Sequence, residues 1–146
     1  MVRNIVYIIP AFNEYPTAKI YKNIANLFSK KGMSVKIVYV DWKSKKVMLA
    51  YTKEFLNYFE KTNKNEDNVF LFGFSAGAWI AFISALYIVP KNVILCSPSP
   101  YFKEDMKFWK PEWIKSIGSV RFNDFKNYEF NKIIKRFKSR IIILVG

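Results

Sequence analysis

The residues of this chain best suited to chemistry are the five in Gly73-Phe74-Ser75-Ala76-Gly77. They follow a short apolar run and open a long apolar segment, so the pattern predicts a strand, a tight turn that holds Ser75, and a helix. A hydroxyl held in such a turn projects from the backbone and can attack a carbonyl group. The small residues two before and two after Ser75 relieve the crowding in the turn. We therefore predict that Ser75 is a nucleophile.

The backbone beside Ser75 supplies a second part of the same chemistry. The N–H group of Ala76 is expected at the N-terminus of the helix, where unpaired donors and the helix dipole favour negative charge. Such a donor is half of an oxyanion hole. The alternative is a glycine-rich turn without catalysis, in which Ser75 only caps the helix.

The hydrophobic pattern predicts five strands that alternate with four helices. Apolar runs predict strands over residues 4–9, 35–40, 69–72, 92–97 and 141–145. Stripes with helical spacing predict helices over residues 16–28, 47–59, 76–89 and 130–137. This alternation predicts an α/β fold, a three-layer sandwich whose five-stranded, mostly parallel sheet has the order 2-1-3-4-5 with helices on both faces. The first and third strands are then neighbours, so the loop at 10–15 should face Ser75.

The chain is expected to form one domain, residues 1–146, with an irregular excursion at residues 97–123. Prolines and tryptophans mark this excursion, and its aromatic side chains fit either a lid over an apolar pocket or the packing of a long loop. The single cysteine, Cys96, excludes a disulfide within the chain, and the sequence has no histidine. We therefore expect no metal site and no cofactor.

The formal net charge of +13 raises the question of a nucleic-acid partner. The lysines are spread over nearly all predicted helices and loops, and only four of the 24 basic residues are arginine. This distribution favours a solvated, lysine-rich surface over specific nucleic-acid binding. The apolar runs are too short for a secretory signal or a membrane span, so we expect a cytoplasmic location and no membrane partner.

The order of elements, the motif around Ser75 and the loop Ile9-Pro10-Ala11-Phe12 together resemble the α/β-hydrolase superfamily, in a reduced form without its first two antiparallel strands. The resemblance implies a serine hydrolase with Ser75 in the nucleophile elbow, acting on a carboxylester, thioester or related acyl substrate of small size. It also implies a lid at the excursion, and an oxyanion hole formed by the backbone N–H groups of Phe12 and Ala76. Pro10-Ala11 stands where the superfamily usually carries His-Gly.

The histidine that activates the serine in this superfamily is absent from the sequence. The resemblance puts the catalytic acid in the loop after residues 141–145 and the histidine one strand later. We therefore expect residues 1–146 to be the C-terminally incomplete first part of a longer hydrolase, with little turnover of their own. Asp105, in the pair Glu104-Asp105, is a weaker candidate for the acid. The apolar edge strand at 141–145 also predicts self-association.

Two other functions fit the sequence. One is a non-catalytic binding or interaction protein on a hydrolase scaffold, whose edge strand pairs with another chain. The other is a flavodoxin-like module in which the backbone amides around Ser75 hold a nucleotide or phosphate. The phosphate-binding patterns G-x-G-x-x-G and G-x-x-x-x-G-K-[ST] are both absent from the sequence, which weighs against the second of these.

Overall fold

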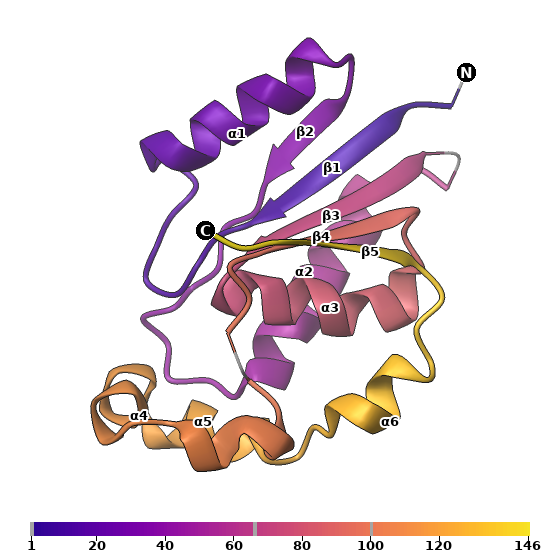
Figure 1. Ribbon diagram of the computed structural model, residues 1–146. Helices are drawn as coiled ribbons and strands as arrows, with labels where there is room; N and C mark the ends of the chain where they lie inside the picture. Colours follow the sequence, from indigo (N-terminus) through magenta and orange to yellow (C-terminus); the bar gives the residue numbers. More distant parts are fainter. Residues whose placement is uncertain (1, 66, 100) are drawn as a thin grey trace.

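A computed structural model describes residues 2–65, 67–99 and 101–146. Within these ranges, five parallel strands form one sheet (Figure 1). They are β1 (Asn4–Ile9), β2 (Ser34–Ile37), β3 (Asn68–Phe74), β4 (Asn92–Cys96) and β5 (Arg140–Leu144). Their order across the sheet is β2-β1-β3-β4-β5, so the predicted strand order is confirmed.

Helices cover both faces of the sheet, as predicted. Helix α1 (Lys19–Lys30) lies on one face, and α2 (Met48–Thr62) and α3 (Ala76–Ile88) lie on the other (Figure 1). Successive side chains of a strand point to opposite faces. In β1, Val6 and Ile8 therefore pack with α1, while Tyr7 and Ile9 belong to the larger core with α2 and α3. This alternation produces the three layers.

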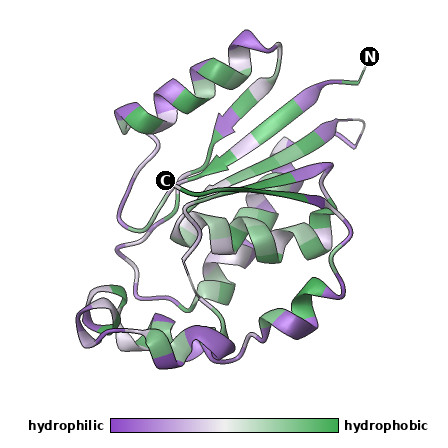
Figure 2. Ribbon diagram, in the orientation of Figure 1, coloured by the Kyte–Doolittle hydropathy of each residue, from purple (hydrophilic) through white to green (hydrophobic). Residues whose placement is uncertain are grey.

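Helix α3 is much more apolar than α1 and α2 (Figure 2). Every residue from Ala76 to Ala85 is buried. A helix that is apolar around its whole circumference must be covered on nearly all sides, and the small side chains of Ala78 and Ala81 allow close packing. The core therefore fixes the helix that begins directly after Ser75.

Strand β2 is shorter than the sequence predicted. The prediction extended it to Val40, whereas the paired strand ends at Ile37. The chain beyond it stays extended, because the Val38 N–H group donates to the Ile8 carbonyl oxygen at 2.8 Å. Val38, Val40 and Trp42 are buried in alternation, and this pattern looks like a strand even where the ladder has ended.

The connecting segment, residues 101–134 between β4 and β5, is more helical than predicted. It contains the 3₁₀ helix η1 (Lys103–Phe108) and the helices α4 (Pro111–Ile117), α5 (Ser119–Phe125) and α6 (Phe130–Ile134). Pro111 starts α4, and Gly118 with φ +89° separates α4 from α5, so each helix is too short to show a period. The predicted helix over 130–137 ends early, at Ile134. Pro100, part of the predicted excursion, lies outside the described residues.

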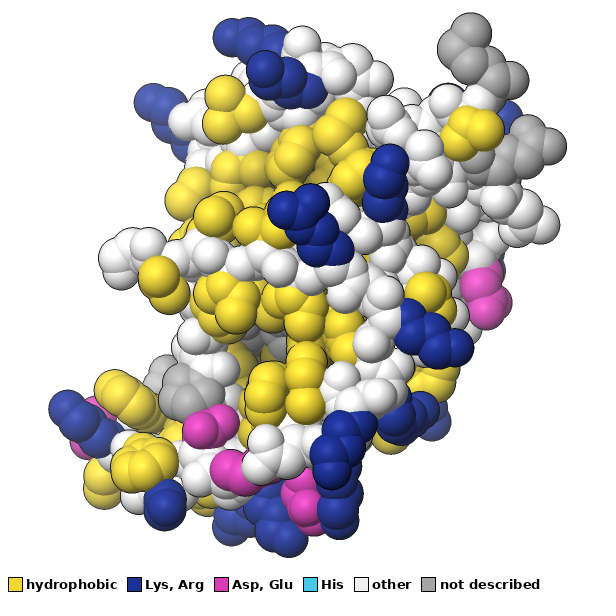
Figure 3. Space-filling model, turned by 45° about the vertical axis from the view of Figure 1, so that its right-hand side comes forward, with side chains coloured by type: hydrophobic (Ala, Val, Ile, Leu, Met, Phe, Trp, Pro, Cys, Tyr) yellow, Lys and Arg dark blue, Asp and Glu magenta, His cyan; other side chains and the backbone are white. Residues whose placement is uncertain are grey.

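Strand β5 lies at the edge of the sheet, with Ile143 and Leu144 exposed. Hydrophobic side chains gather over the middle of one face of the molecule, and basic side chains lie mostly around them (Figure 3). Self-association through this strand stays a prediction. None of the helices in the ranges that the structure describes is long and apolar enough to cross a lipid bilayer.

Candidate active site

Ser75 lies in a sharp turn between the last residue of β3 and the first residue of α3. Its backbone has φ +52° and ψ −115°, a conformation that residues other than glycine rarely adopt. Its N–H group donates to the Cys96 carbonyl oxygen of the neighbouring β4 at 3.0 Å, and its carbonyl oxygen accepts from the Ala78 N–H group at 2.9 Å. Main-chain hydrogen bonds on both sides therefore hold the strained residue in place.

The two glycines of the motif allow main-chain segments to approach closely. A Cβ atom at Gly73 would lie 2.5 Å from the Cα atom of Ala78, and one at Gly77 would overlap the carbonyl oxygens of Ile9 and Pro10. Both separations are shorter than real Cβ contacts. The start of α3 thus presses directly on the end of β1, and this contact brings the loop after β1 to Ser75.

The loop after β1 is held from the other side by a buried tyrosine of α1. The Ala11 N–H group donates to the Tyr21 hydroxyl at 2.8 Å, and that hydroxyl donates to the Glu14 carboxylate. Burial raises the pKa of Tyr21 far above its usual value, so the hydroxyl keeps its proton at neutral pH. This arrangement fixes the backbone next to Phe12.

Phe12 and Ser75 line the same pocket, which has a volume of about 330 Å³. Within the described part of the chain, the N–H groups of Phe12 and Ala76 donate to no protein acceptor. The Ser75 Oγ atom is 3.3 Å from the Tyr101 hydroxyl oxygen, and either hydroxyl can donate. The connecting segment supplies most of the other lining side chains: Tyr101, Trp109, Trp113, Ser116 and Ile117.

Asp105, the candidate acid, lies in η1 and does not line the pocket of Ser75. It lines a second pocket of about 430 Å³ together with Glu104. The Glu104 carboxylate accepts from the N–H groups of Phe130 and Asn131 at 3.0 and 3.1 Å, which caps the start of α6. The structure therefore brings Phe12, Ser75 and Ala76 together but leaves Asp105 in the neighbouring pocket, and its role as the acid stays a prediction.

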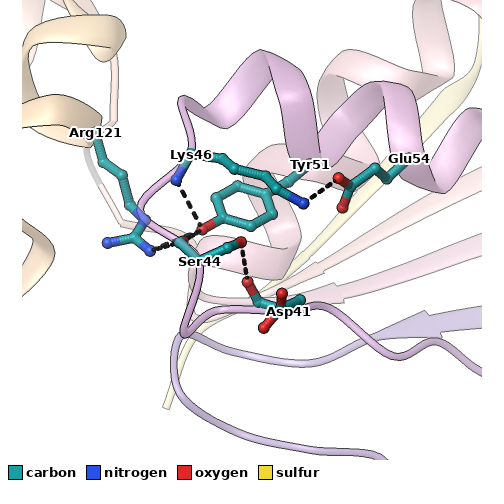
Figure 4. Close-up of polar contacts among 6 residues, drawn as sticks. All are labelled: Asp41, Ser44, Lys46, Tyr51, Glu54 and Arg121. Carbon is teal, nitrogen blue, oxygen red and sulfur yellow. Dashed lines mark hydrogen bonds and ion pairs between the residues drawn. The ribbon is translucent and has the colours of Figure 1, made fainter.

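The sequence analysis missed Arg121, which joins the connecting segment to the rest of the site (Figure 4). This buried side chain donates to the carbonyl oxygens of Ile117, Trp42 and Ser44 and to the Tyr51 hydroxyl, at 2.7–2.9 Å. Its guanidinium carbon also lies 5.0 Å from the centre of the Phe12 ring. The one available signal was an arginine between apolar residues in a chain that uses lysine for most of its basic positions.

Tyr101 is one of the aromatic residues of the predicted excursion. Its hydroxyl lies beside Ser75 and its ring packs against Phe125, at 4.8 Å between ring centres. Trp109 and Trp113 line the same pocket, whereas Phe108 is exposed, and a lid stays a prediction. A polar contact across 26 positions of sequence leaves no local pattern, so it could not be found from the sequence.

No protein-family model matches the sequence, and no curated protein is similar to it. Solved structures do match. One is Est1E from Butyrivibrio proteoclasticus, in a structure with ferulic acid bound (TM-score 0.65, 12% identity, 99% of this chain and 80% of that one). The chain has the α/β-hydrolase fold.

Two further structures of this fold support the same assignment. Mouse alpha/beta hydrolase domain-containing protein 10 matches with a TM-score of 0.69 at 10% identity, over 97% of this chain and 79% of that one. A putative hydrolase from Agrobacterium vitis matches with a TM-score of 0.74 at 10% identity, over 98% and 78%. At identities this low, the matches show the α/β-hydrolase fold alone.

Proposed function

We propose that this chain is the core of a serine hydrolase in which Ser75 attacks the carbonyl carbon of a small ester, thioester or related acyl substrate. The observation that carries the proposal is the strained backbone of Ser75, in a turn whose glycines let α3 press on the loop of Phe12. Strain of this kind persists only where surrounding structure enforces it, and it is typical of active sites. The hydrolase scaffold supports the same conclusion.

The proposed reaction forms and breaks one bond in each of two steps. The Ser75 Oγ atom bonds to the carbonyl carbon, its proton passes to a base, and the alcohol, thiol or amine leaves with a proton. Water then releases the acyl group from Ser75. The negative oxygen formed in each step would accept hydrogen bonds from the N–H groups of Phe12 and Ala76, and each such donor typically contributes about 3–4 kcal/mol to transition-state stabilisation.

The base in this proposal comes from outside the 146 residues. The sequence contains no histidine, and the described residues that line the pocket of Ser75 carry no carboxylate and no amine. The Tyr101 hydroxyl is near Ser75, but a phenol is a hydrogen-bond donor at neutral pH rather than a base. We propose that an imidazole, with its supporting carboxylate, reaches Ser75 from a further segment or from a partner chain.

Labelling with a fluorophosphonate in the presence of added imidazole tests this proposal on the chain itself. The small base should enter the pocket, activate Ser75 and direct the label to that residue, as located by peptide mass spectrometry. Ser75→Ala should abolish the label, whereas Ser99→Ala, which removes another hydroxyl of the same pocket, should leave it. No label on Ser75 at saturating imidazole, or an equal label on Ser99, would contradict the proposal.

A non-catalytic binding protein on the hydrolase scaffold is the second candidate. The observation in its favour is that the hydrogen-bond partner of the Ser75 hydroxyl is a tyrosine, not a base. In that case imidazole would have no effect on labelling, and the rate at Ser75 would equal that of an ordinary exposed serine.

A further inference from the structure

We propose that the pocket next to that of Ser75 binds an apolar organic cation. This aromatic pocket has a volume of about 430 Å³, which is large enough for a small aromatic or branched alkyl group. The lining residues that carry the argument are Trp79, Phe82, Tyr101, Phe102, Glu104 and Asp105.

The walls of the aromatic pocket are rigid rings. Phe82 stacks on Phe130 and Phe137, with ring centres 5.8 and 4.7 Å apart, and Phe102 meets Phe82 edge to face at 5.6 Å. Because Phe82 is stacked on other rings, these walls offer a ligand apolar contact area rather than charge. The sign of the ligand charge is set by the carboxylates that line the pocket.

The charge of the aromatic pocket is opposite to that of the whole protein. The chain has 24 basic and 11 acidic residues, yet the described residues that line the pocket include Glu104 and Asp105 and no lysine or arginine. Glu104 is already engaged as the cap of α6. The Asp105 carboxylate has no hydrogen bond or ion pair within the described ranges, so its charge is available to a ligand.

The lysines of η1 do not cancel this charge through direct contact. Lys103 pairs with Glu129 at 3.3 Å, and the Lys107 amine lies 4.9 Å from the centre of the Phe108 ring. Neither lysine lines the pocket. Asp105 therefore remains the unpaired charge next to the aromatic walls.

The position of the aromatic pocket connects it with Ser75. Ser99 and Tyr101 line both pockets, and the Tyr101 hydroxyl is 3.3 Å from the Ser75 Oγ atom. The two pockets are therefore adjacent, with Tyr101 as a shared wall. We infer that the cation is one part of the acyl substrate. This last step rests on the proposed hydrolase function, whereas binding of the cation does not.

Three probes that share a phenethyl group test the proposal: phenethyltrimethylammonium, its neutral tert-butyl counterpart of nearly the same shape, and the smaller anion 3-phenylpropionate. Binding is measured by tryptophan fluorescence in the Ser75→Ala variant, so a failure of hydrolysis cannot affect the result. We expect the cation to bind about tenfold more tightly than the neutral probe, and the anion to bind most weakly.

Two matched variants locate the effect. Asp105→Asn should weaken binding of the cation about fivefold and leave the neutral probe unchanged, because it removes the charge but keeps the shape. Glu112→Gln removes an exposed carboxylate of α4 that does not line the pocket, and should change neither affinity. Equal affinities for all three probes, no binding at all, or equal effects of the two variants would overturn the proposal.

Discussion

The turn at Ser75 and the connecting segment are held in place by different parts of the chain. Main-chain atoms fix the turn: the Ser75 N–H group bonds to the Cys96 carbonyl oxygen, and Gly77 packs on the carbonyl oxygens of Ile9 and Pro10. Side chains fix the connecting segment. The rings of Trp79 and Tyr128 are in contact, with centres 4.8 Å apart, and Arg121 donates a hydrogen bond to the Trp42 carbonyl oxygen. Main-chain contacts admit few residue types, whereas ring contacts can be rebuilt with many. The turn is therefore suited to chemistry that must not change, and the segment to specificity that can.

The largest loss of stability expected from this difference is on mutation of Gly77. Gly77→Ala places a Cβ atom on the carbonyl oxygens of Ile9 and Pro10, which cannot move without breaking β1, so the free energy of unfolding should fall by about 3 kcal/mol or more. Gly32→Ala is the control: Gly32 has φ +78° but no neighbour within 4 Å of an added Cβ, and should cost about 1 kcal/mol. Urea denaturation measures both. Equal losses would mean that the close approach at the turn does not matter.

The next largest loss of stability is expected on mutation of Arg121, whose hydrogen bonds connect the connecting segment to the loop of Trp42 and Ser44. Arg121→Met leaves the carbonyl oxygens of Trp42 and Ser44 without this donor, and should lower the free energy of unfolding by about 2–3 kcal/mol. Arg136→Met removes the same charge from an exposed position and should change the free energy of unfolding by less than about 0.5 kcal/mol. A loss at Arg121 no greater than that at Arg136 would show that side chains other than Arg121 hold the segment.

The backbone strain at Ser75 predicts a smaller change in stability, for which glycine should be a better replacement than alanine. Ser75→Gly should be more stable than Ser75→Ala by about 1 kcal/mol, because glycine adopts φ +52° without a steric cost. At Ser29, an exposed position in α1, the order should be the reverse, since glycine is the poorer helix former. Thermal and urea denaturation of the four variants check both orders. If Ser75→Gly were the less stable of its pair, the turn would carry no strain.

The smallest effect is a pH dependence of the free energy of unfolding, which reports how closely the connecting segment packs on α3. Burial, with Asp124 and Tyr87 nearby, raises the pKa of Tyr128 to about 12. This contribution to stability is complete below pH 10, the ordinary tyrosine pKa, and is lost as the pH rises toward 12. At pH 10.5 the free energy of unfolding should already be lower by about 0.8 kcal/mol from this cause. Tyr128→Phe should abolish this part of the alkaline decline, whereas Tyr39→Phe, at an exposed tyrosine, should not. Identical pH profiles for both variants would contradict the raised pKa of the partly buried Tyr128.

Much of the core could be predicted because its patterns are local. Most strands contain a continuous apolar run, α3 is apolar on all sides, and the motif at Ser75 demands a turn. Parallel neighbours place their carboxyl ends together, so the approach of Phe12 to Ser75 followed from the strand order. These features depend on residue type and spacing alone.

The connecting segment could not be predicted in the same way. Its helices have five to seven residues, too few to show a period, and its contacts join rings far apart in the sequence, such as Tyr101 and Phe125. The separation of Asp105 from Ser75 likewise depends on how η1 packs, which no local pattern records. Tertiary packing decided these positions.

The most direct test of the site is the binding of phenylboronic acid, observed by NMR. With imidazole added as the base, the Ser75 Oγ atom would add to the trigonal boron and pass its proton to imidazole, forming a tetrahedral anion whose oxygen mimics the one in hydrolysis. We predict that the backbone amide signals of Phe12 and Ala76 shift strongly downfield on saturation, and that neither shifts in Ser75→Ala. An adduct on Ser75 that leaves the amide signals of Phe12 and Ala76 unmoved would contradict the proposed oxyanion hole.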